Sequence, residues 1–269
     1  RWLNVGITTF QPSEVAKFAV ILYFAATISV KKERMKTFQD GIFPYFLILG
    51  VISVLMLMEP HLSGTVLILG IGASMMFVGG ISQKMVGLGV GIGVLGIAIL
   101  ASGVLPYGQS RIMQWKDPWA YAADEGYQTV QSLLAIGSGG LAGLGFGKGR
   151  QKLMYLPEEH NDMIFAIVCE ELGFIGAALI LALFCFLVLR GYWIAVHARD
   201  RFGGLLAVGI ITMIAMQTFL NVAVVTNFVP NTGISLPFFS YGGTALLIQL
   251  FEMGVLLSVS RQMPGPKSG

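Results

Sequence analysis

Charged side chains are scarce in this sequence. Asp, Glu, Lys and Arg make up 12% of its 269 residues, about half of their share in an average soluble domain. Hydrophobic residues make up 55%, and the mean hydropathy is +0.76. This composition excludes an ordinary soluble domain and predicts an integral membrane protein. The net charge of +3 comes from short separate clusters, so nucleic-acid binding is not expected.

Cysteine and histidine are also rare. The two cysteines, Cys169 and Cys185, lie within one apolar segment, so we expect them to pack in the core rather than to form a disulfide or bind a metal. The histidines, His61, His160 and His197, show no HxxxH or HExxH spacing. A structural zinc site is therefore not expected.

The glycine-rich run from Gly137 to Arg150 lacks the spacing of a phosphate loop. A GxxxxGK[ST] motif would need Gly at position 142 and Ser or Thr at position 149, where this sequence has Ala142 and Gly149. No GxGxxG register fits either, so no nucleotide cofactor is expected. Three basic residues of this region either meet phosphate or simply face solvent and lipid headgroups: Lys148, Arg150 and Lys152.

Seven apolar segments are long enough to cross about 30 Å of hydrocarbon. They are residues 13–30, 43–58, 65–80, 85–105, 162–189, 203–228 and 241–260. The predicted fold is therefore an all-α, polytopic transmembrane helix bundle. Only six residues, EPHLSG, separate the second and third segments, which predicts a tight hairpin or a broken helix there.

The positions of Lys and Arg predict the orientation of the spans. Basic residues gather in four places, namely 30–36, Lys84, 190–201 and 261–267, and these four segments alternate so as to share the cytoplasmic side. Residues 59–64, 106–161 and 228–240 then face outward, as does Arg1. An outward start without a signal peptide leads us to expect an odd number of spans upstream of this sequence.

The outward loop 106–161, between the fourth and fifth spans, is the longest aqueous segment, and loops of this length are usually functional or disordered. Within it, apolar residues recur at helical spacing from Tyr127 to Gly137. This pattern predicts a short amphipathic helix, which lies on the membrane surface or packs on the bundle.

A polar segment turns into an apolar one between Leu156 and Gly173. Asp162 stands at this junction, where its carboxylate either caps the fifth helix or belongs to a site. Glu170 and Glu171 follow eight and nine residues later, about 12 Å further along a helix, which is too far for a closely spaced carboxylate pair with Asp162. We expect them to pair inside the bundle or support its packing, as Glu252 would in the last span.

Glu14 and Lys17 lie one turn apart near the outward end of the first span. Ionisable groups inside a membrane are costly and normally face a partner or a cavity. The predicted topology places Lys17 at a depth similar to that of Asp162, so an ion pair between them is possible. The uncharged last loop, Asn227 to Thr244, is either a helix-breaking connection or a re-entrant lip beside a polar cavity.

Five ordered motifs in this sequence resemble those of one family, the SEDS proteins (shape, elongation, division and sporulation). They are FQPSEVAKF (10–18), EPHLSGT (59–65), RIMQWKDPW followed by GYQTVQSLLAIGSGGLAGLGFG (111–147), LPEEHNDMIFAIVCEELGFIG (156–176) and NVAVVTNFVPNTGISLPFFSYGGT (221–244). The fourth and fifth motifs are closer to the division and sporulation branch of the family. EPHLSGT departs from the PDxGT pattern more common in the family.

The resemblance implies a ten-span fold, of which residues 1–269 form the last seven spans as a single domain, with the expected active-site loop at 106–161. It implies a multi-pass protein of the bacterial cytoplasmic membrane with an extracytoplasmic active site. The implied activity is polymerisation of lipid II into glycan strands, with inversion at the anomeric carbon and release of undecaprenyl diphosphate, in cell division or sporulation.

The resemblance also assigns residues and partners. Asp162 matches the essential acidic residue and is the expected catalytic base, with Mg²⁺ or Mn²⁺ as a candidate cofactor beside it. The expected supporting or substrate-binding residues are Glu14, Lys17, Lys148, Arg150, Lys152, His160 and Ser240. Implied partners are a single-span class B penicillin-binding transpeptidase and other division or elongation membrane proteins. A lipid II flippase and a non-catalytic scaffold stay open as alternatives.

Overall fold

The computed structural model describes residues 3–4, 9–59, 62–82, 85, 87–89, 91, 106–124, 126–151, 156–157 and 160–263. The regular secondary structure of this part is helical except for two paired strands of two residues each, β1 (Leu3–Asn4) and β2 (Thr9–Phe10). The predicted helical class is therefore confirmed. The fold divides into two compact units that are interleaved along the sequence. Unit 1 comprises Arg1–Gly89, Phe186–Met216 and Gly242–Gly269, and unit 2 comprises Val90–Cys185 and Gln217–Tyr241.

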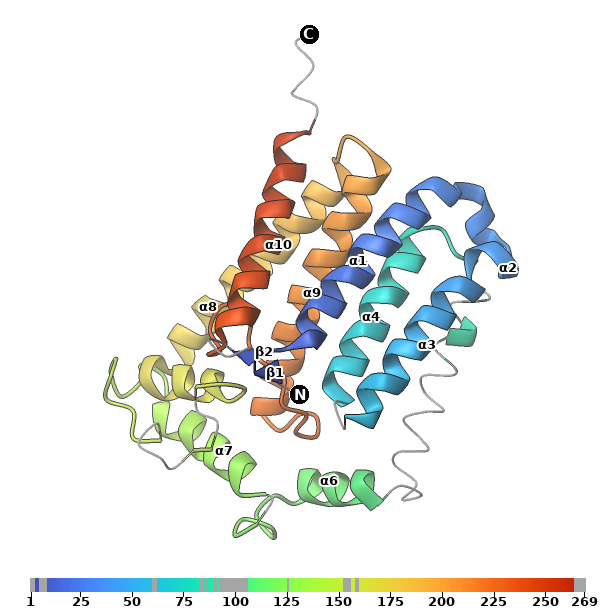
Figure 1. Ribbon diagram of the computed structural model, residues 1–269. Helices are drawn as coiled ribbons and strands as arrows, with labels where there is room; N and C mark the ends of the chain where they lie inside the picture. Colours follow the sequence, from blue (N-terminus) through green and yellow to red (C-terminus); the bar gives the residue numbers. More distant parts are fainter. Residues whose placement is uncertain are drawn as a thin grey trace. The chain divides into compact units, whose positions relative to one another are not determined.

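Unit 1 is built on three helices that pack side by side, α1 (Pro12–Lys31), α3 (Phe43–Met58) and α4 (Leu62–Val78) (Figure 1). Phe24 and Tyr45 pack edge to face across α1 and α3, with ring centroids 4.8 Å apart. Helix α3 ends at Met58, α4 begins at Leu62, and the two helices pack against each other. Residues 60 and 61 of the predicted hairpin or helix break lie outside the described residues.

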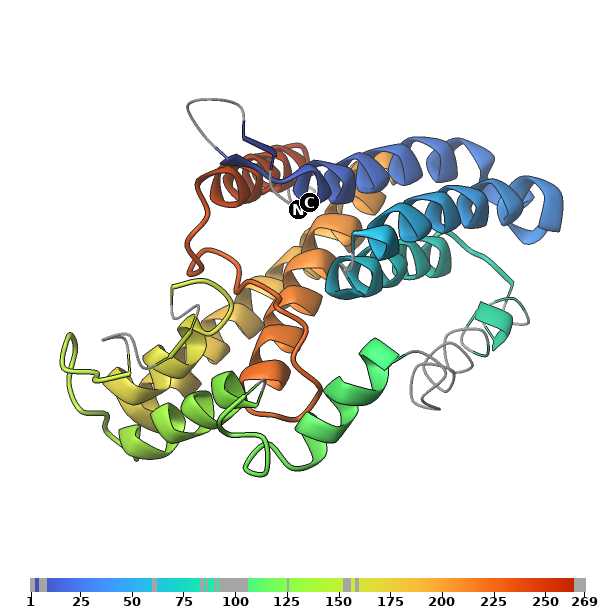
Figure 2. The ribbon, with the colours of Figure 1, turned by 60° about the horizontal axis from the view of Figure 1, so that its bottom comes forward.

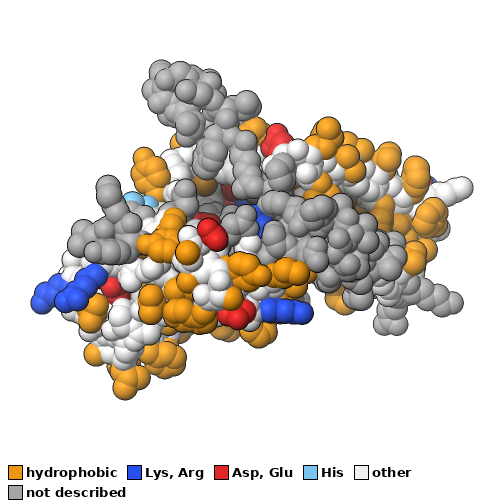
Figure 3. Space-filling view, turned by 90° about the horizontal axis from the view of Figure 1, so that it is seen from below, with side chains coloured by type: hydrophobic (Ala, Val, Ile, Leu, Met, Phe, Trp, Pro, Cys, Tyr) orange, Lys and Arg blue, Asp and Glu red, His pale blue; other side chains and the backbone are white. Residues whose placement is uncertain are grey.

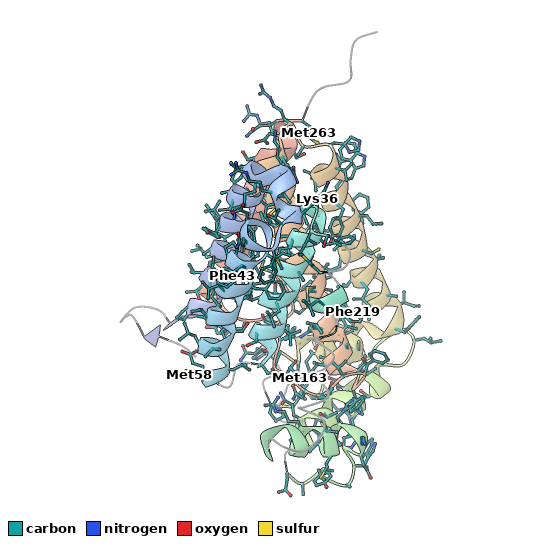
Figure 4. All side chains as sticks on the ribbon, turned by 90° about the vertical axis from the view of Figure 1, so that its right-hand side faces the viewer. Lys36, Phe43, Met58, Met163, Phe219 and Met263 are labelled. Carbon is teal, nitrogen blue, oxygen red and sulfur yellow. The ribbon has the colours of Figure 1, made fainter. Side chains whose placement is uncertain are left out.

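The basic segments of unit 1 share one end of its helices. η1 (Lys32–Lys36) and α2 (Phe38–Gly41) follow α1, and Arg201 at the start of α9 (Arg201–Val225) donates a 2.8 Å hydrogen bond to the Gly79 carbonyl oxygen just beyond α4. In Figure 4, Lys36 lies toward the end marked by Met263, opposite Met58. This clustering is what the positive-inside pattern requires, because loops on one membrane side must meet at one end of the bundle.

Unit 2 contains α6 (Pro106–Lys116), α7 (Tyr127–Gly139), the first part of α8 (Ile164–Val196) and the last part of α9. The helix predicted from Tyr127 is confirmed as α7. Helix α7 packs on its neighbours through the face that carries the small residue Ser132. The Ser132 hydroxyl donates a 2.8 Å hydrogen bond to the Val225 carbonyl oxygen, and the large side chain of Leu134 is exposed. The packed arrangement, one of the two expected, is the one observed within unit 2.

Among the described residues, five helices are long and apolar enough to cross a membrane, at Pro12–Lys31, Phe38–Met58, Ile164–Val196, Arg201–Val225 and Gly243–Arg261. The last of these is α10. The third predicted span is the shorter α4, with 17 residues. The fourth predicted span, 85–105, lies mostly outside the described residues. The chain is thus a multi-pass membrane protein, and the count of seven spans stays a prediction.

The long helix α8 differs from the predicted span. Residues 162–189 were expected to form one continuous segment, whereas α8 runs to Val196 and its backbone leaves helical geometry at Gly173, with φ 67° and ψ −170°. The positive φ suits glycine, which has no Cβ to clash. The break separates a short first part, which carries Glu170 and Glu171, from a long apolar second part.

Candidate active site

Asp162 lies where the last loop of the chain is tied to the segment before α8. The Ser240 hydroxyl donates a 2.6 Å hydrogen bond to the backbone oxygen of Asn161, and the Tyr241 amide donates a 2.7 Å bond to that of His160. Ser240 also accepts a 2.7 Å bond from the Leu236 amide. These bonds fix the backbone on the N-terminal side of Asp162 against residues about 80 positions later.

We call residues 160–162 and the part of the last loop that contacts them the Asp162 corner. Asn221 holds its C-terminal side. Its side chain is fully buried, and its amide nitrogen donates 2.7 Å hydrogen bonds to the backbone oxygens of both Asp162 and Ile234. Gly233 has a φ of 65°, and a Cβ at this position would lie 3.3 Å from Oδ2 of Asp162. The Asp162 carboxylate therefore faces the backbone of the last loop, where a larger residue would crowd it.

Helix α6 holds the same loop from another direction. Arg111 donates a hydrogen bond from Nη1 to the Asn231 carbonyl oxygen. Trp115 donates a 3.0 Å bond from its indole nitrogen to the Asn227 carbonyl oxygen and accepts a 3.2 Å bond from the Asn227 side chain. Asn231 in turn accepts a 3.2 Å bond from the Gly233 amide. A chain of contacts therefore leads from Arg111 through the loop to the residue that faces Asp162.

Sequence reasoning missed Asn221 and Arg111 as residues of this corner. Asn221 carried a usable signal, because a polar amide within an apolar span normally has a structural or functional partner. Arg111 stood in one of the family-like motifs but was not singled out. Nothing in the local sequence shows that either residue contacts the last loop, since both contacts join positions far apart in the chain.

Glu170 and Glu171 hold the segment 140–150, which we call the glycine loop. The Glu171 carboxylate accepts hydrogen bonds from the Gly147 amide at 2.9 Å and from the Gly149 amide at 3.3 Å. The Glu170 carboxylate accepts a 2.8 Å bond from the Arg150 amide. Figure 2 shows this segment folded back on the first turns of α8. The expected supporting role of the two glutamates is thus observed, with loop backbone rather than other side chains as the partner.

These contacts give the glycine-rich sequence a structural purpose. Gly143, at φ 80°, lies so close to the backbone of Glu171 that a Cβ would overlap its carbonyl oxygen. Amides of this kind can bind an anion, and here the anions they bind are the carboxylates of Glu170 and Glu171. Lys148 and Arg150 are exposed on the loop. Lys152, like Glu158 and Glu159, lies outside the described residues.

The pair Glu14 and Lys17 lies in unit 1. Lys17 Nζ and Glu14 Oε1 are 2.7 Å apart, and both side chains are buried. Glu252 of α10 is also fully buried, neither of its carboxylate oxygens has a hydrogen-bond partner, and it lies within electrostatic reach of Lys17 and Glu14. Lys17 and Asp162 belong to different units, so the hypothesis that they form an ion pair stays a prediction.

The residues singled out from the sequence therefore fall into three groups. Asp162, His160 and Ser240 come together at the corner between α8 and the last loop. Lys148 and Arg150 lie on the glycine loop, and Glu14 with Lys17 forms the buried pair of unit 1. In the part of the chain that the structure describes, no three His, Cys, Asp or Glu side chains gather as a metal site would require.

The protein is a multi-pass helical membrane protein in which the last loop contacts the backbone around an acidic residue, Asp162, just before the long helix α8. A family model described as "Cell cycle protein", FtsW/RodA/SpoVE, matches residues 1–264. The chain belongs to this family, which confirms the resemblance stated from its motifs.

Curated relatives match nearly the whole chain. It is 42% identical over 266 residues to the probable peptidoglycan glycosyltransferase FtsW of Geobacter sp. strain M18, covering 98% of this chain and 72% of that protein. It is 43% identical over 262 residues to stage V sporulation protein E of Bacillus subtilis strain 168, covering 97% and 71%. These names support the placement near the division and sporulation branch.

Solved structures share the fold. A chain from a peptidoglycan synthase complex that coordinates polymerisation and crosslinking matches with a TM-score of 0.77 and 25% identity, over 97% of this chain and 72% of that one. The rod shape determining protein RodA of Thermus thermophilus matches with a TM-score of 0.67 and 25% identity, over 98% and 70%.

Proposed function

We propose that this chain is a peptidoglycan glycosyltransferase that polymerises lipid II, and that Asp162 is its catalytic base. The observation that carries the assignment of the base is the way in which the backbone around Asp162 is held. Hydrogen bonds from Asn221, Ser240 and Tyr241 hold the backbone of residues 160–162. A carboxylate fixed in this way is preorganised to take a proton from a substrate hydroxyl.

The proposed reaction needs little more than one base. A sugar hydroxyl of the acceptor attacks the anomeric carbon of the donor, a new C–O bond forms, and the bond from that carbon to the diphosphate oxygen breaks. The hydroxyl proton passes to Asp162, and undecaprenyl diphosphate leaves with the electron pair. Direct displacement inverts the anomeric carbon. Diphosphate is a stable anion, so a general acid is not required.

Cations near the leaving group would stabilise its charge in the transition state. The exposed Lys148 and Arg150 of the glycine loop have the chemistry to contact phosphate oxygens. A divalent cation such as Mg²⁺ or Mn²⁺ is commonly held by one or two carboxylates together with substrate phosphates. Asp162 supplies one such carboxylate, and a bound cation would share the diphosphate charge.

The proposal includes a place and a partner. The basic segments at one end of unit 1 support a cytoplasmic location for that end. The alternation of basic segments along the sequence supports an extracytoplasmic side for the loop 106–161 and Asp162. By analogy with the peptidoglycan synthase complex, the partner would be a single-span class B penicillin-binding transpeptidase. This partner would crosslink the strands that the glycosyltransferase makes.

The decisive experiment compares Asp162→Asn with Asp124→Asn, which changes an exposed carboxylate of the same loop. Full-length protein is purified with its transpeptidase, and polymer formed from lipid II in liposomes is measured. We expect Asp162→Asn to lose about 100-fold or more in rate, as removal of a general base does, with unchanged melting and partner binding. The Asp124→Asn control should keep its activity. Polymer formation by Asp162→Asn near the normal rate would refute the role of the base.

Two further measurements separate the alternatives. Asp162→Glu keeps a carboxylate but moves it, so an altered requirement for Mg²⁺ or Mn²⁺ would identify a metal ligand, and an unaltered one a base. Fluorescent lipid II that crosses the bilayer of proteoliposomes without polymer formation would favour the flippase. Normal growth with neutral residues at Glu14, Lys17 and Asp162 would favour a scaffold.

A further inference from the structure

We propose that the glycine loop is a membrane anchor. In this proposal Leu141 and Phe146 insert among the acyl chains at the bilayer surface, while Lys148 and Arg150 contact the phosphate groups of the lipids. The occupant of this surface is the lipid bilayer itself. The inference rests on the membrane span of α8 and not on the identity of the reaction.

The first observation is where the loop is attached. The Phe174 amide donates a 2.9 Å hydrogen bond to the Gly140 carbonyl oxygen, and the Ile175 amide donates a 3.1 Å bond to that of Leu141. Amides of residues 144 and 145 bond to the carbonyl oxygens of residues 170 and 171 at 3.0 Å. The loop therefore lies directly against α8 on both sides of its break at Gly173.

The second observation is the length of α8. Beyond the break at Gly173, residues 174–196 of α8 extend about 35 Å at 1.5 Å per residue, which is enough to cross the roughly 30 Å of hydrocarbon. About 20 residues from Phe174 reach Trp193, whose ring lies 4.1 Å from the guanidinium carbon of Arg190. Trp and Arg are typical of a membrane interface. With that end at one surface, the break at Gly173 and the attached loop lie at the other.

The third observation is the exposure of large apolar side chains on and beside the loop. Their exposed fractions are 87% for Phe146, 72% for Leu141, 68% for Phe174 and 66% for Ile175. Leaving such large apolar side chains in water instead of burying them is unfavourable. The patch continues into Leu179 and Leu183, which are also exposed on the apolar part of α8. Because a spanning helix exposes such residues to lipid, the bilayer is the surface that covers the patch.

The fourth observation is charge. Both carboxylates next to the loop, Glu170 and Glu171, are buried and accept hydrogen bonds from loop amides. The exposed charged side chains of the loop are therefore Lys148 and Arg150. A cation is attracted electrostatically to an anionic membrane surface. Figure 3, seen from the side of α6 and α7, shows exposed hydrophobic side chains together with separate groups of Lys and Arg.

The test measures where residue 146 lies. In a Cys169→Ala, Cys185→Ala background, Phe146→Cys is spin-labelled in the full-length protein in nanodiscs of phosphatidylcholine and phosphatidylglycerol. Accessibility of the label to oxygen, which partitions into lipid, is compared with accessibility to a water-soluble nickel chelate. Leu179→Cys serves as the reference for lipid and for correct folding, and Asp124→Cys as the reference for water.

We expect the label at position 146 to favour oxygen, as the one at 179 does, without any substrate present. Lys148→Gln with Arg150→Gln should make the label shallower in nanodiscs that contain phosphatidylglycerol and leave it unchanged in pure phosphatidylcholine. A label at 146 that behaves like the one at 124 would overturn the proposal. So would a label that leaves water only when lipid II is added, since the contact would then be with the polyprenyl chain of the substrate.

Discussion

The hydroxyl of Ser240 donates a 2.6 Å hydrogen bond to the carbonyl oxygen of Asn161, the residue before Asp162. The same hydroxyl accepts a bond from the Leu236 amide, so one small side chain organises the last loop and attaches it to the proposed base. The position of Asp162 thus depends on a residue that has no acid–base chemistry of its own.

Ser240→Ala should lower lipid II polymerisation several-fold while the protein stays folded. Loss of a typical hydrogen bond costs about 1 kcal/mol, which is enough to loosen the corner but not the fold. Ser240→Thr keeps the hydroxyl and should restore most of the rate. Thr226→Val is the matched control, because the Thr226 hydroxyl donates to carbonyl oxygens of the preceding turn, those of Val222 and Ala223. Equal rates for Ser240→Ala and the control would contradict the prediction.

Asn221→Leu and Asn221→Asp should both destabilise the protein, with Asp the more severe. Leu leaves two buried carbonyl oxygens without their donor, at about 1–3 kcal/mol each. A carboxylate at this position would in addition face those two oxygens with like partial charge. The melting temperature in detergent is therefore expected to fall in the order wild type, Asn221→Leu, Asn221→Asp. A variant Asn221→Asp as stable as wild type would show that the two hydrogen bonds contribute little.

Glu14→Gln should cost less stability than Lys17→Met. Breaking a buried pair typically costs about 3–5 kcal/mol because one charge is left alone. When Glu14 is neutral, Lys17 still has the carboxylate of Glu252 within electrostatic reach. When Lys17 is lost, two buried carboxylates remain together.

The role of Glu252 in this difference can be isolated. In a Glu252→Gln background the advantage of Glu14→Gln over Lys17→Met should shrink, because Lys17 then has no second carboxylate. Thermal unfolding of the four variants in detergent forms a double-mutant cycle that measures the coupling. An unchanged difference between the two variants would exclude Glu252 as the alternative partner of Lys17.

Glu171→Gln should loosen the glycine loop without unfolding the protein. An amide side chain offers one acceptor oxygen where the carboxylate accepts from Gly147 and Gly149 with two. Hydrogen bonds to a charged group contribute about 1.5–3 kcal/mol, so amide hydrogen exchange in residues 144–151 should rise roughly 10- to 100-fold. Glu252→Gln in unit 1 is the control and should leave this exchange unchanged. Similar exchange in both variants would mean that the loop is held by its backbone bonds alone.

The membrane class, the helix positions and the family followed from the sequence because each depends on local properties. Apolar length predicts a span wherever it occurs, and α1 and α3 match their predicted bounds almost residue for residue. The spacing from Tyr127 predicted α7 for the same reason. Five motifs in order were enough to indicate the family, and Asp162, Glu14 and Lys17 were named with it.

The tertiary structure decided the contacts between residues that are far apart in the sequence. Helical rise placed Glu170 and Glu171 away from Asp162 but could not show that a glycine-rich segment about 20 residues earlier donates its amides to them. Asn221 and Arg111 stood in the sequence as ordinary polar residues, and Ser240 was expected as a supporting residue without a named partner. Their roles arise from hydrogen bonds that close loops of tens of residues. The sequence by itself determined the membrane class and which carboxylate stands at the junction, since these are properties of composition and spacing. Only the fold decided which backbone holds that carboxylate, because a hydrogen bond depends on position in space and not on distance along the chain.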